Sequence, residues 1–183
     1  PTEQIQLALR TMPPVPGRLE SVVAGQPFSV FVDYAHTEDA LLHVLRTVRE
    51  ITPGRVLLGF GCGGARDTDK RAKMGSVAAQ LADHTVITSD NPRREAPAAI
   101  AAQIEAGFRA VRPDAFSVEL DRAVALRQLL RRAQAGDTVL IAGKGHETYQ
   151  EFEDTVVPFD DRVHAREALE ELGWTAAPLP KAA

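Results

Sequence analysis

Short apolar segments rich in β-branched residues alternate along this chain with segments whose apolar residues have helical spacing. The strand-like segments are residues 28–32, 55–60, 84–88, 115–119 and 138–142. The helical segments between them are residues 37–51, 70–82, 98–108 and 121–135. Strands that are apolar on both faces and separated by helices of about 10 to 15 residues are typical of a mostly parallel sheet with helices on both sides. The sequence therefore predicts an α/β fold, a Rossmann-like three-layer domain.

The alternation changes character near the C-terminal end. Residues 149–159 contain two short β-like pieces on either side of Glu153-Asp154, and residues 161–172 have the pattern of a closing amphipathic helix. A hairpin of this kind can add an antiparallel strand to the edge of a parallel sheet. We therefore expect an antiparallel edge strand, with this segment as the candidate for it.

The two ends of the chain do not follow the alternation. Residues 2–10 have helical spacing, and the prolines at positions 13 and 14 stop that helix. We expect residues 1–14 to be the end of a preceding domain or a linker. Residues 15–174 are expected to form one domain, and residues 175–183 a frayed tail.

Composition restricts the classes of function. With 183 residues, 44% of them hydrophobic, the chain can bury one sizeable core. The net charge is −4 and basic residues are interspersed with acidic ones, so no basic patch for nucleic acid is evident. Cys62 is the single cysteine, which fits a reducing cytoplasm. No apolar run approaches the roughly 20 residues needed to cross a bilayer. We expect a cytoplasmic protein that binds neither nucleic acid nor membrane.

Four loops are the candidates for a ligand site. In an open α/β sheet, ligands bind beyond the carboxyl ends of the parallel strands. The loops that follow four of the predicted strands are residues 33–36, 61–67, 90–94 and 143–147. Each of them is rich in glycine or in charged residues, which favours this edge as the site.

Two loops that contain glycine suggest common nucleotide motifs, residues 59–64 a dinucleotide fingerprint and Gly143-Lys144 a phosphate-binding loop, and neither fits. A dinucleotide fingerprint opens directly into a helix, whereas residues 65–69 intervene here. The alternative interpretation is a tight turn that leaves a buried strand. Gly143-Lys144 resembles part of a phosphate-binding loop, but Gly145 stands where that motif has Ser or Thr. The sequence has no P-loop.

The residues after the third strand suggest a site for a zwitterion. Arg93 follows Asn91-Pro92, and a rigidly held guanidinium is suited to bidentate contact with a carboxylate. Arg66 could supply a second guanidinium, and Glu147 could bind an ammonium group. An isolated arginine is more often a solvated surface residue, so the interpretation depends on the loops meeting. Asp33 is predicted either to anchor its loop or to orient a sugar hydroxyl, and His36 to contact a nucleotide.

Five motifs in a fixed order resemble the C-terminal domain of MurE-type Mur ligases. They are Val15-Pro16-Gly17-Arg18-Leu19-Glu20, Asp33-Tyr34-Ala35-His36-Thr37, Gly61-Cys62-Gly63-Gly64, Asp90-Asn91-Pro92-Arg93 and Gly143-Lys144-Gly145-His146-Glu147. The resemblance covers nearly the whole chain. One departure is that the family usually has Asp where this chain has Ala65, which removes a carboxylate beside Arg66.

The resemblance implies roles for individual residues. The Asp-Asn-Pro-Arg loop marks family members that take meso-diaminopimelate, and lysine-adding members differ at its arginine. The implied diaminopimelate contacts are Arg66, Asp90, Asn91, Pro92, Arg93, Gly143 and Glu147. The implied ATP contacts are Arg18, Asp33 and His36. No residue of this chain is implied as a metal ligand or as a catalytic group by itself.

The resemblance also implies a three-domain, ATP-dependent ligase of peptidoglycan synthesis. Such an enzyme adds meso-diaminopimelate to UDP-MurNAc-L-Ala-D-Glu through an acyl phosphate, and other domains supply the P-loop, the Mg²⁺ ligands and the UDP-sugar site. Three other functions remain open. They are a lysine-adding Mur ligase, a non-catalytic amino-acid- or nucleotide-binding module, and a dinucleotide-dependent oxidoreductase.

Overall fold

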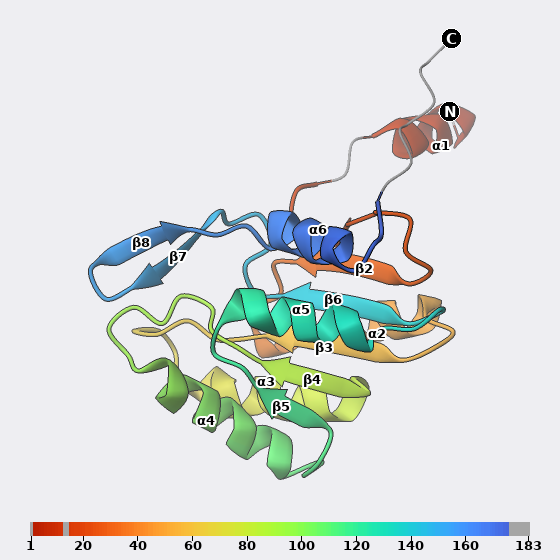
Figure 1. Ribbon diagram of the computed structural model, residues 1–183. Coiled ribbons are helices and arrows are strands. Elements are labelled where there is room, and N and C mark those ends of the chain that lie inside the picture. The colour runs from red at the N-terminus through yellow and green to blue at the C-terminus, as the bar shows by residue number, and fades with distance from the viewer. Residues whose placement is uncertain (1, 13–14, 176–183) are drawn as a thin grey trace.

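The computed structural model describes residues 2–12 and 15–175, which include a six-stranded sheet (Figure 1). The strand order is β1-β2-β6-β3-β4-β5. The strands are β1 (Glu20–Ser21), β2 (Ser29–Asp33), β3 (Val56–Phe60), β4 (His84–Ile87), β5 (Phe116–Val118) and β6 (Thr138–Ala142). Strands β2 to β6 are parallel to their neighbours, and β1 pairs with β2 in the antiparallel direction. The predicted mostly parallel sheet with an antiparallel edge is confirmed.

Helices cover both faces of this sheet. One face carries α2 (Glu38–Ile51), α3 (Asp69–Leu81) and α4 (Pro97–Arg109), and the other carries α5 (Arg122–Arg132) and α6 (Asp161–Glu171). In Figure 1, α5 and α6 lie in front of the strands, and α2 and α3 behind them. The predicted three layers are therefore confirmed, and the helices begin and end within a few residues of the predicted bounds.

The central strands show why their sequences are apolar throughout. All five residues of β3 and of β6 are buried. Leu58 and Leu140 pack with the helices of one face, whereas Leu57 and Val139 pack with those of the other. Because side chains alternate along a strand, a strand between two helical layers needs an apolar residue at every position.

Side-chain caps place the starts of two helices where the sequence predicts them. The Thr37 hydroxyl accepts a hydrogen bond from the backbone N–H of Ala40 at 3.3 Å, and Asp121 accepts one from Val124 at 3.0 Å. Such caps satisfy N–H groups that have no partner within the helix.

The C-terminal hairpin does not form the edge of the large sheet, so that prediction was wrong. Strands β7 (Tyr149–Phe152) and β8 (Thr155–Pro158) make a separate two-stranded sheet. The loop between β6 and β7 contains Gly143 and Gly145, whose positive φ angles turn the chain away from the large sheet. The free edge of β2 is paired instead with the short β1, which the sequence analysis had not identified as a strand.

The N-terminal segment is helical, as predicted, over α1 (Thr2–Thr11), and this helix stands apart from the sheet in Figure 1. The prolines at positions 13 and 14 and residues 176–183 lie outside the described residues, so the expected frayed tail is not tested beyond Thr175. No helix in the described ranges is long and apolar enough to cross a membrane.

Candidate functional site

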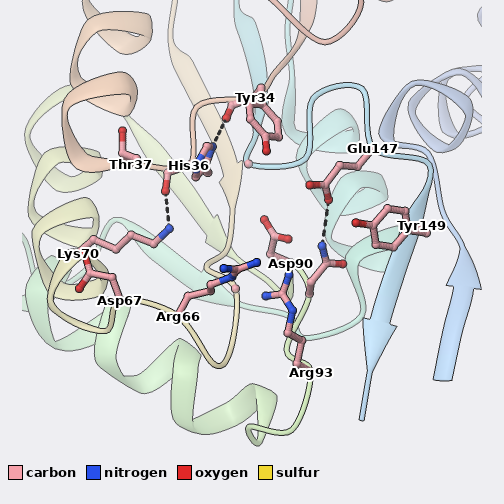
Figure 2. Close-up of a pocket in the computed structure, with 13 residues that line it drawn as sticks. Tyr34, His36, Thr37, Arg66, Asp67, Lys70, Asp90, Arg93, Glu147 and Tyr149 are labelled. Atoms are coloured by element: carbon pink, nitrogen blue, oxygen red, sulfur yellow. Dashed lines mark hydrogen bonds between the residues drawn. The ribbon is translucent and has the colours of Figure 1, made fainter. Parts of the chain in front are cut away.

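The four predicted loops meet around one cavity of about 540 Å³. It is lined by Tyr34, His36, Thr37, Gly63, Arg66, Asp67, Lys70, Asp90, Asn91, Arg93, Gly143, Glu147 and Tyr149. Figure 2 shows the side chains of Arg66 and Arg93 extending into it from one side, with Glu147 and Tyr149 across from them. Parallel strands bring their carboxyl ends to the same edge, which is why loops distant in the sequence converge here.

Arg93 is held in place by the hairpin and by the glycine-rich loop. Its Nε donates to a Glu151 carboxylate oxygen at 2.8 Å, and its Nη1 donates to the carbonyl of Gly64 at 2.9 Å. Its backbone N–H donates to the Glu151 carbonyl at 2.9 Å, and its carbonyl accepts from the Glu153 N–H at 2.6 Å. No described residue accepts a hydrogen bond from Nη2. The guanidinium is therefore positioned and keeps donors free for a carboxylate.

Two glycines allow this close arrangement of loops. A Cβ on Gly64 would lie 1.9 Å from the carbonyl oxygen of Pro92, and a Cβ on Gly143 would lie 2.8 Å from a carboxylate oxygen of Asp90. Pro92 itself is buried beneath Gly64 and does not line the cavity. Its contribution is to hold the loop that carries Asn91 and Arg93.

Arg66 projects into the cavity from an exposed loop whose backbone is held by Glu95 and Arg71. The N–H of Ala65 donates to Glu95 at 2.6 Å, and Glu95 accepts two further hydrogen bonds from Arg71. Arg71 is fully buried and also donates to the carbonyl of Gly63 at 3.1 Å. The sequence analysis missed this anchor, because an arginine in a helix gives no sign of a partner 24 residues away.

Opposite the arginines, one buried cation joins three polar side chains. Lys144 donates to the Asn91 side-chain oxygen at 3.0 Å and to Glu147 at 3.1 Å, and its Nζ lies 3.9 Å from Asp90. Asn91 in turn donates to Glu147 at 2.9 Å. Burial raises the pKa of Asp90 above its ordinary value, although Arg122 and Lys144 act in the opposite direction. The sequence analysis had not assigned Lys144 a role.

A second buried ion pair supports the floor of the site. Arg122 and Asp161 are both fully buried and make two hydrogen bonds of 2.7 and 2.8 Å. The same guanidinium donates to the carbonyls of Ser89 and Ala142, which follow β4 and end β6. It therefore ties together the strand ends that present Asp90 and Gly143, and no local pattern in the sequence indicated it.

The residues expected to contact ATP lie at one edge of this region. His36 lines the cavity, and its Nδ1 donates to the carbonyl of Tyr34 at 2.9 Å. Arg18 is exposed and lies over the Tyr34 ring at 4.9 Å. Asp33 does not line the cavity, and its carboxylate accepts backbone hydrogen bonds from Leu19 and Ala35, both at 2.8 Å. Asp33 thus anchors its loop, which is one of its two predicted roles.

The chemistry available at the cavity is recognition of a molecule with anionic and cationic ends. Guanidinium groups lie on one side, and the carboxylates of Asp90 and Glu147 on the other. In the described ranges, no three histidine, cysteine or acidic side chains are placed to hold a metal ion.

Comparison with known proteins identifies the family. The family described as "Mur ligase, glutamate ligase domain" matches residues 17–145. The chain is 49% identical to the UDP-N-acetylmuramoyl-L-alanyl-D-glutamate--2,6-diaminopimelate ligase of Solibacter usitatus, over 94% of this chain and 35% of that protein. It is 54% identical to the enzyme of the same name from Synechococcus elongatus, over 86% of this chain and 31% of that protein. The chain thus spans about a third of the length of these relatives.

A solved structure supports the same assignment. The structure of a UDP-N-acetylmuramoyl-L-alanyl-D-glutamate--2,6-diaminopimelate ligase superposes with a TM-score of 0.78 at 36% identity, covering 94% of this chain and 37% of that one. The region of the family match contains all six strands of the large sheet and three of the five motifs in full, and it overlaps the first and the last motif in part. The resemblance inferred from those motifs is confirmed, and the chain belongs to the Mur ligase family as its C-terminal, glutamate ligase domain.

Proposed function

We propose that this chain is the amino-acid-binding domain of an ATP-dependent ligase that adds meso-diaminopimelate to UDP-MurNAc-L-Ala-D-Glu in cytoplasmic peptidoglycan synthesis. The names of its relatives support the reaction. The geometry of the cavity supports the choice of amino acid. The chain's part is to bind the amino acid and present its amine, and catalysis of this kind depends on positioning.

The observation that carries the choice of diaminopimelate is the placement of Arg93. Diaminopimelate and lysine share one amino-acid end, but only diaminopimelate has a carboxylate at the other end. Arg93 is fixed by Glu151 and Gly64 while its Nη2 keeps its donors free, and Arg66 lies beside it. Glu147, across the cavity, is suited to an ammonium group. Lysine would leave Arg66 and the free Nη2 of Arg93 without a ligand carboxylate to bind.

The nucleotide would lie at the edge formed by Arg18 and His36. Arg18 can turn from the Tyr34 ring to a phosphate, and His36 can contact the nucleotide while Asp33 holds the loop between them. ATP supplies the phosphoryl group that activates the acceptor carboxylate. The P-loop and the Mg²⁺ ligands belong to other parts of the ligase in this proposal, and residues 1–14 belong to the end of the preceding domain or to a linker.

The test is the substitution Arg93→Ala in the full-length ligase that contains this chain. A charged hydrogen bond contributes about 1.5 to 3 kcal/mol, so kcat/KM for meso-diaminopimelate should fall about 10- to 150-fold. The kcat/KM for lysine, which lacks the second carboxylate, should change little. Both specificity constants would be measured at saturating ATP.

Arg94→Ala is the matched control. Arg94 is the next residue, and its side chain is 81% exposed. Among the described residues it pairs only with Asp154, which is 88% exposed. This variant should behave like the parent enzyme with both amino acids. A parallel fall for diaminopimelate and lysine in Arg93→Ala, or no fall for either, would show that Arg93 does not bind the second carboxylate.

A further inference from the structure

The side chain of Lys144 is buried at the site without lining the cavity. It follows β6, it is 0% exposed, and it is not among the residues that line the cavity. An ammonium group is costly to bury unless it is paired and hydrogen-bonded. Its Nζ meets that condition through Asn91, Glu147 and Asp90. A direct contact with substrate is therefore not its role, and its effect must pass through these neighbours.

Lys144 and the backbone of the hairpin together fix which way the Asn91 amide faces. An ammonium group only donates, so the Asn91 side-chain oxygen must face Nζ. The same oxygen accepts from the backbone N–H of Glu151 at 3.1 Å. The Asn91 NH₂ group then faces Glu147 and donates to Oε2 at 2.9 Å.

The consequence for Glu147 is that one oxygen is occupied and the other is available. Oε2 accepts from both Lys144 and Asn91, whereas no described residue donates to Oε1. Glu147 lines the cavity with its side chain 22% exposed. The carboxylate is therefore held by one oxygen, and the other can accept a hydrogen bond from a ligand ammonium.

The charges of the cluster lead to the same conclusion. The cluster holds two carboxyl groups, those of Asp90 and Glu147, against the single ammonium group of Lys144, so it is complementary to a ligand ammonium group. Arg122 also faces Asp90, but it is paired with Asp161.

We propose that Lys144 is a positioning residue that builds the ammonium-binding part of the amino-acid site by fixing Asn91 and Glu147. The inference rests on the proposed amino-acid-binding function and adds a residue to it. Lys144 acts on binding of the amine-bearing substrate, because its Nζ contacts Asn91, Glu147 and Asp90 rather than Arg18 or His36.

The experiment is Lys144→Met in the full-length ligase, with Lys73→Met as the matched control. Met keeps most of the side-chain length and removes the charge, and Lys73 is an exposed residue of α3. In Lys144→Met, KM for meso-diaminopimelate should rise about tenfold or more, because a charged hydrogen-bond network is lost. KM for ATP should stay at the parent value, and kcat at saturating amino acid should stay within about threefold of it.

A raised KM for meso-diaminopimelate, with KM for ATP and kcat near the parent values, distinguishes a positioning role from general destabilisation. A variant that only unfolds more readily contains less active enzyme, which lowers kcat and leaves KM unchanged. That result, or an unchanged KM for meso-diaminopimelate, would overturn the inference. If the parent enzyme does not use meso-diaminopimelate at all, the proposed function itself is wrong.

A second pair of variants tests the role even if Lys144→Met folds poorly. The double variant Lys144→Met/Glu147→Gln removes both members of the pair, so neither is left as a buried charge without the other, and it is compared with Glu147→Gln alone. If Lys144 acts through Glu147, the double variant should have the same KM for meso-diaminopimelate as Glu147→Gln alone. A further rise of about tenfold in the double variant would contradict that coupling.

Discussion

At the scale of single residues, Ala65 has a backbone conformation that alanine disfavours. Ala65 lies in the loop that carries Arg66. Its φ angle is +51°, in the left-handed region, and its N–H donates to the Glu95 carboxylate. A left-handed conformation costs an L-residue about 1 to 2 kcal/mol, and asparagine and aspartate tolerate it better than alanine. The loop is therefore strained at the position where this chain departs from the usual family pattern.

Ala65→Asn should stabilise the protein. We expect the free energy of unfolding to rise by about 0.5 to 1 kcal/mol, because asparagine adopts positive φ more readily. Urea denaturation of the chain would measure it. The control is Ala72→Asn, at an exposed position in α3, where the lower helix propensity of asparagine should reduce stability by about 0.5 kcal/mol. Equal losses in both variants would contradict strain at Ala65.

Asp137 is a residue whose charge stabilises the fold far from the cavity. Its carboxylate accepts backbone hydrogen bonds from Arg55 at 2.8 Å and Gln134 at 2.9 Å, and a side-chain bond from Arg55 at 2.7 Å. Burial alone would raise the pKa of Asp137. The Arg55 guanidinium and the two N–H groups outweigh burial and hold the pKa below its ordinary value.

This depressed pKa predicts a pH-dependent contribution to stability. The unfolded value is about 3.9, so the contribution is fully present above that pH and is lost as the pH falls through the lower pKa of the folded state. Asp137→Asn should reduce the free energy of unfolding by about 1 to 3 kcal/mol at pH 7, and by less near pH 2 to 3. Urea denaturation at both pH values would test it, with the exposed Asp114→Asn as control. A loss that is the same at both pH values would refute the role of the charge.

At the scale of elements, α3 and α4 pack unusually closely through two glycines. A Cβ on Gly75 would lie 2.1 Å from the carbonyl oxygen of Ile104, and a Cβ on Gly107 would lie 1.8 Å from that of Ala72. Both neighbouring atoms are backbone and cannot move without shifting a helix. This contact sets the distance between the two helices that follow β3 and β4, the strands whose loops carry Arg66 and Arg93.

Gly107→Ala should therefore destabilise the protein even though alanine favours helix. Forcing the helices apart should reduce the free energy of unfolding by about 2 kcal/mol or more, which exceeds the gain in helix propensity of about 1 kcal/mol. Thermal or urea unfolding would measure the change. Ala102→Leu adds a larger side chain at an exposed position of the same helix and should change stability by less than about 0.5 kcal/mol. A neutral or stabilising Gly107→Ala would show that the helices can separate freely.

At the scale of the whole molecule, the chain combines a six-stranded sheet with one cavity at the carboxyl ends of its parallel strands. The described strands and helices enclose two hydrophobic cores, one on each face of the sheet. The amino-acid cavity and the proposed nucleotide edge lie at one end of that sheet. The sequence contains no P-loop, the motif on which an ATP-dependent ligase of this kind depends.

The chain by itself should therefore fold and remain without ligase activity. We expect cooperative urea unfolding, and no amide formation from ATP, meso-diaminopimelate and UDP-MurNAc-L-Ala-D-Glu, since the sequence contains no P-loop to hold the phosphates for the reaction. Phosphate release and product formation would be measured together. Turnover above the uncatalysed background would contradict the division of roles proposed here.

Local patterns in the sequence were sufficient to predict the fold class and the four loops that meet around the cavity. Apolar periodicity and side-chain caps such as Thr37 and Asp121 depend on residues close in sequence, so strands and helices could be located without tertiary information. Parallel strands must end at one edge, which is why the loops of Arg66, Asp90, Arg93 and Glu147 could be expected to meet.

Only the tertiary structure decided which of these side chains are bonded to one another. Asn91 and Glu147 are 56 residues apart, and Arg93 and Glu151 are 58 residues apart. The tertiary structure also decided which strand forms the antiparallel edge of the sheet. That strand is β1, which pairs Glu20 with Val32 and Ser21 with Phe31, and not the C-terminal hairpin. The buried partners of Lys144 and Arg122 follow from strand order and packing, which apolar periodicity does not encode. The sequence does not show which charged residues are buried. Buried charges such as Lys144 and Arg122 are paired because an unpaired charge is unstable in a protein interior.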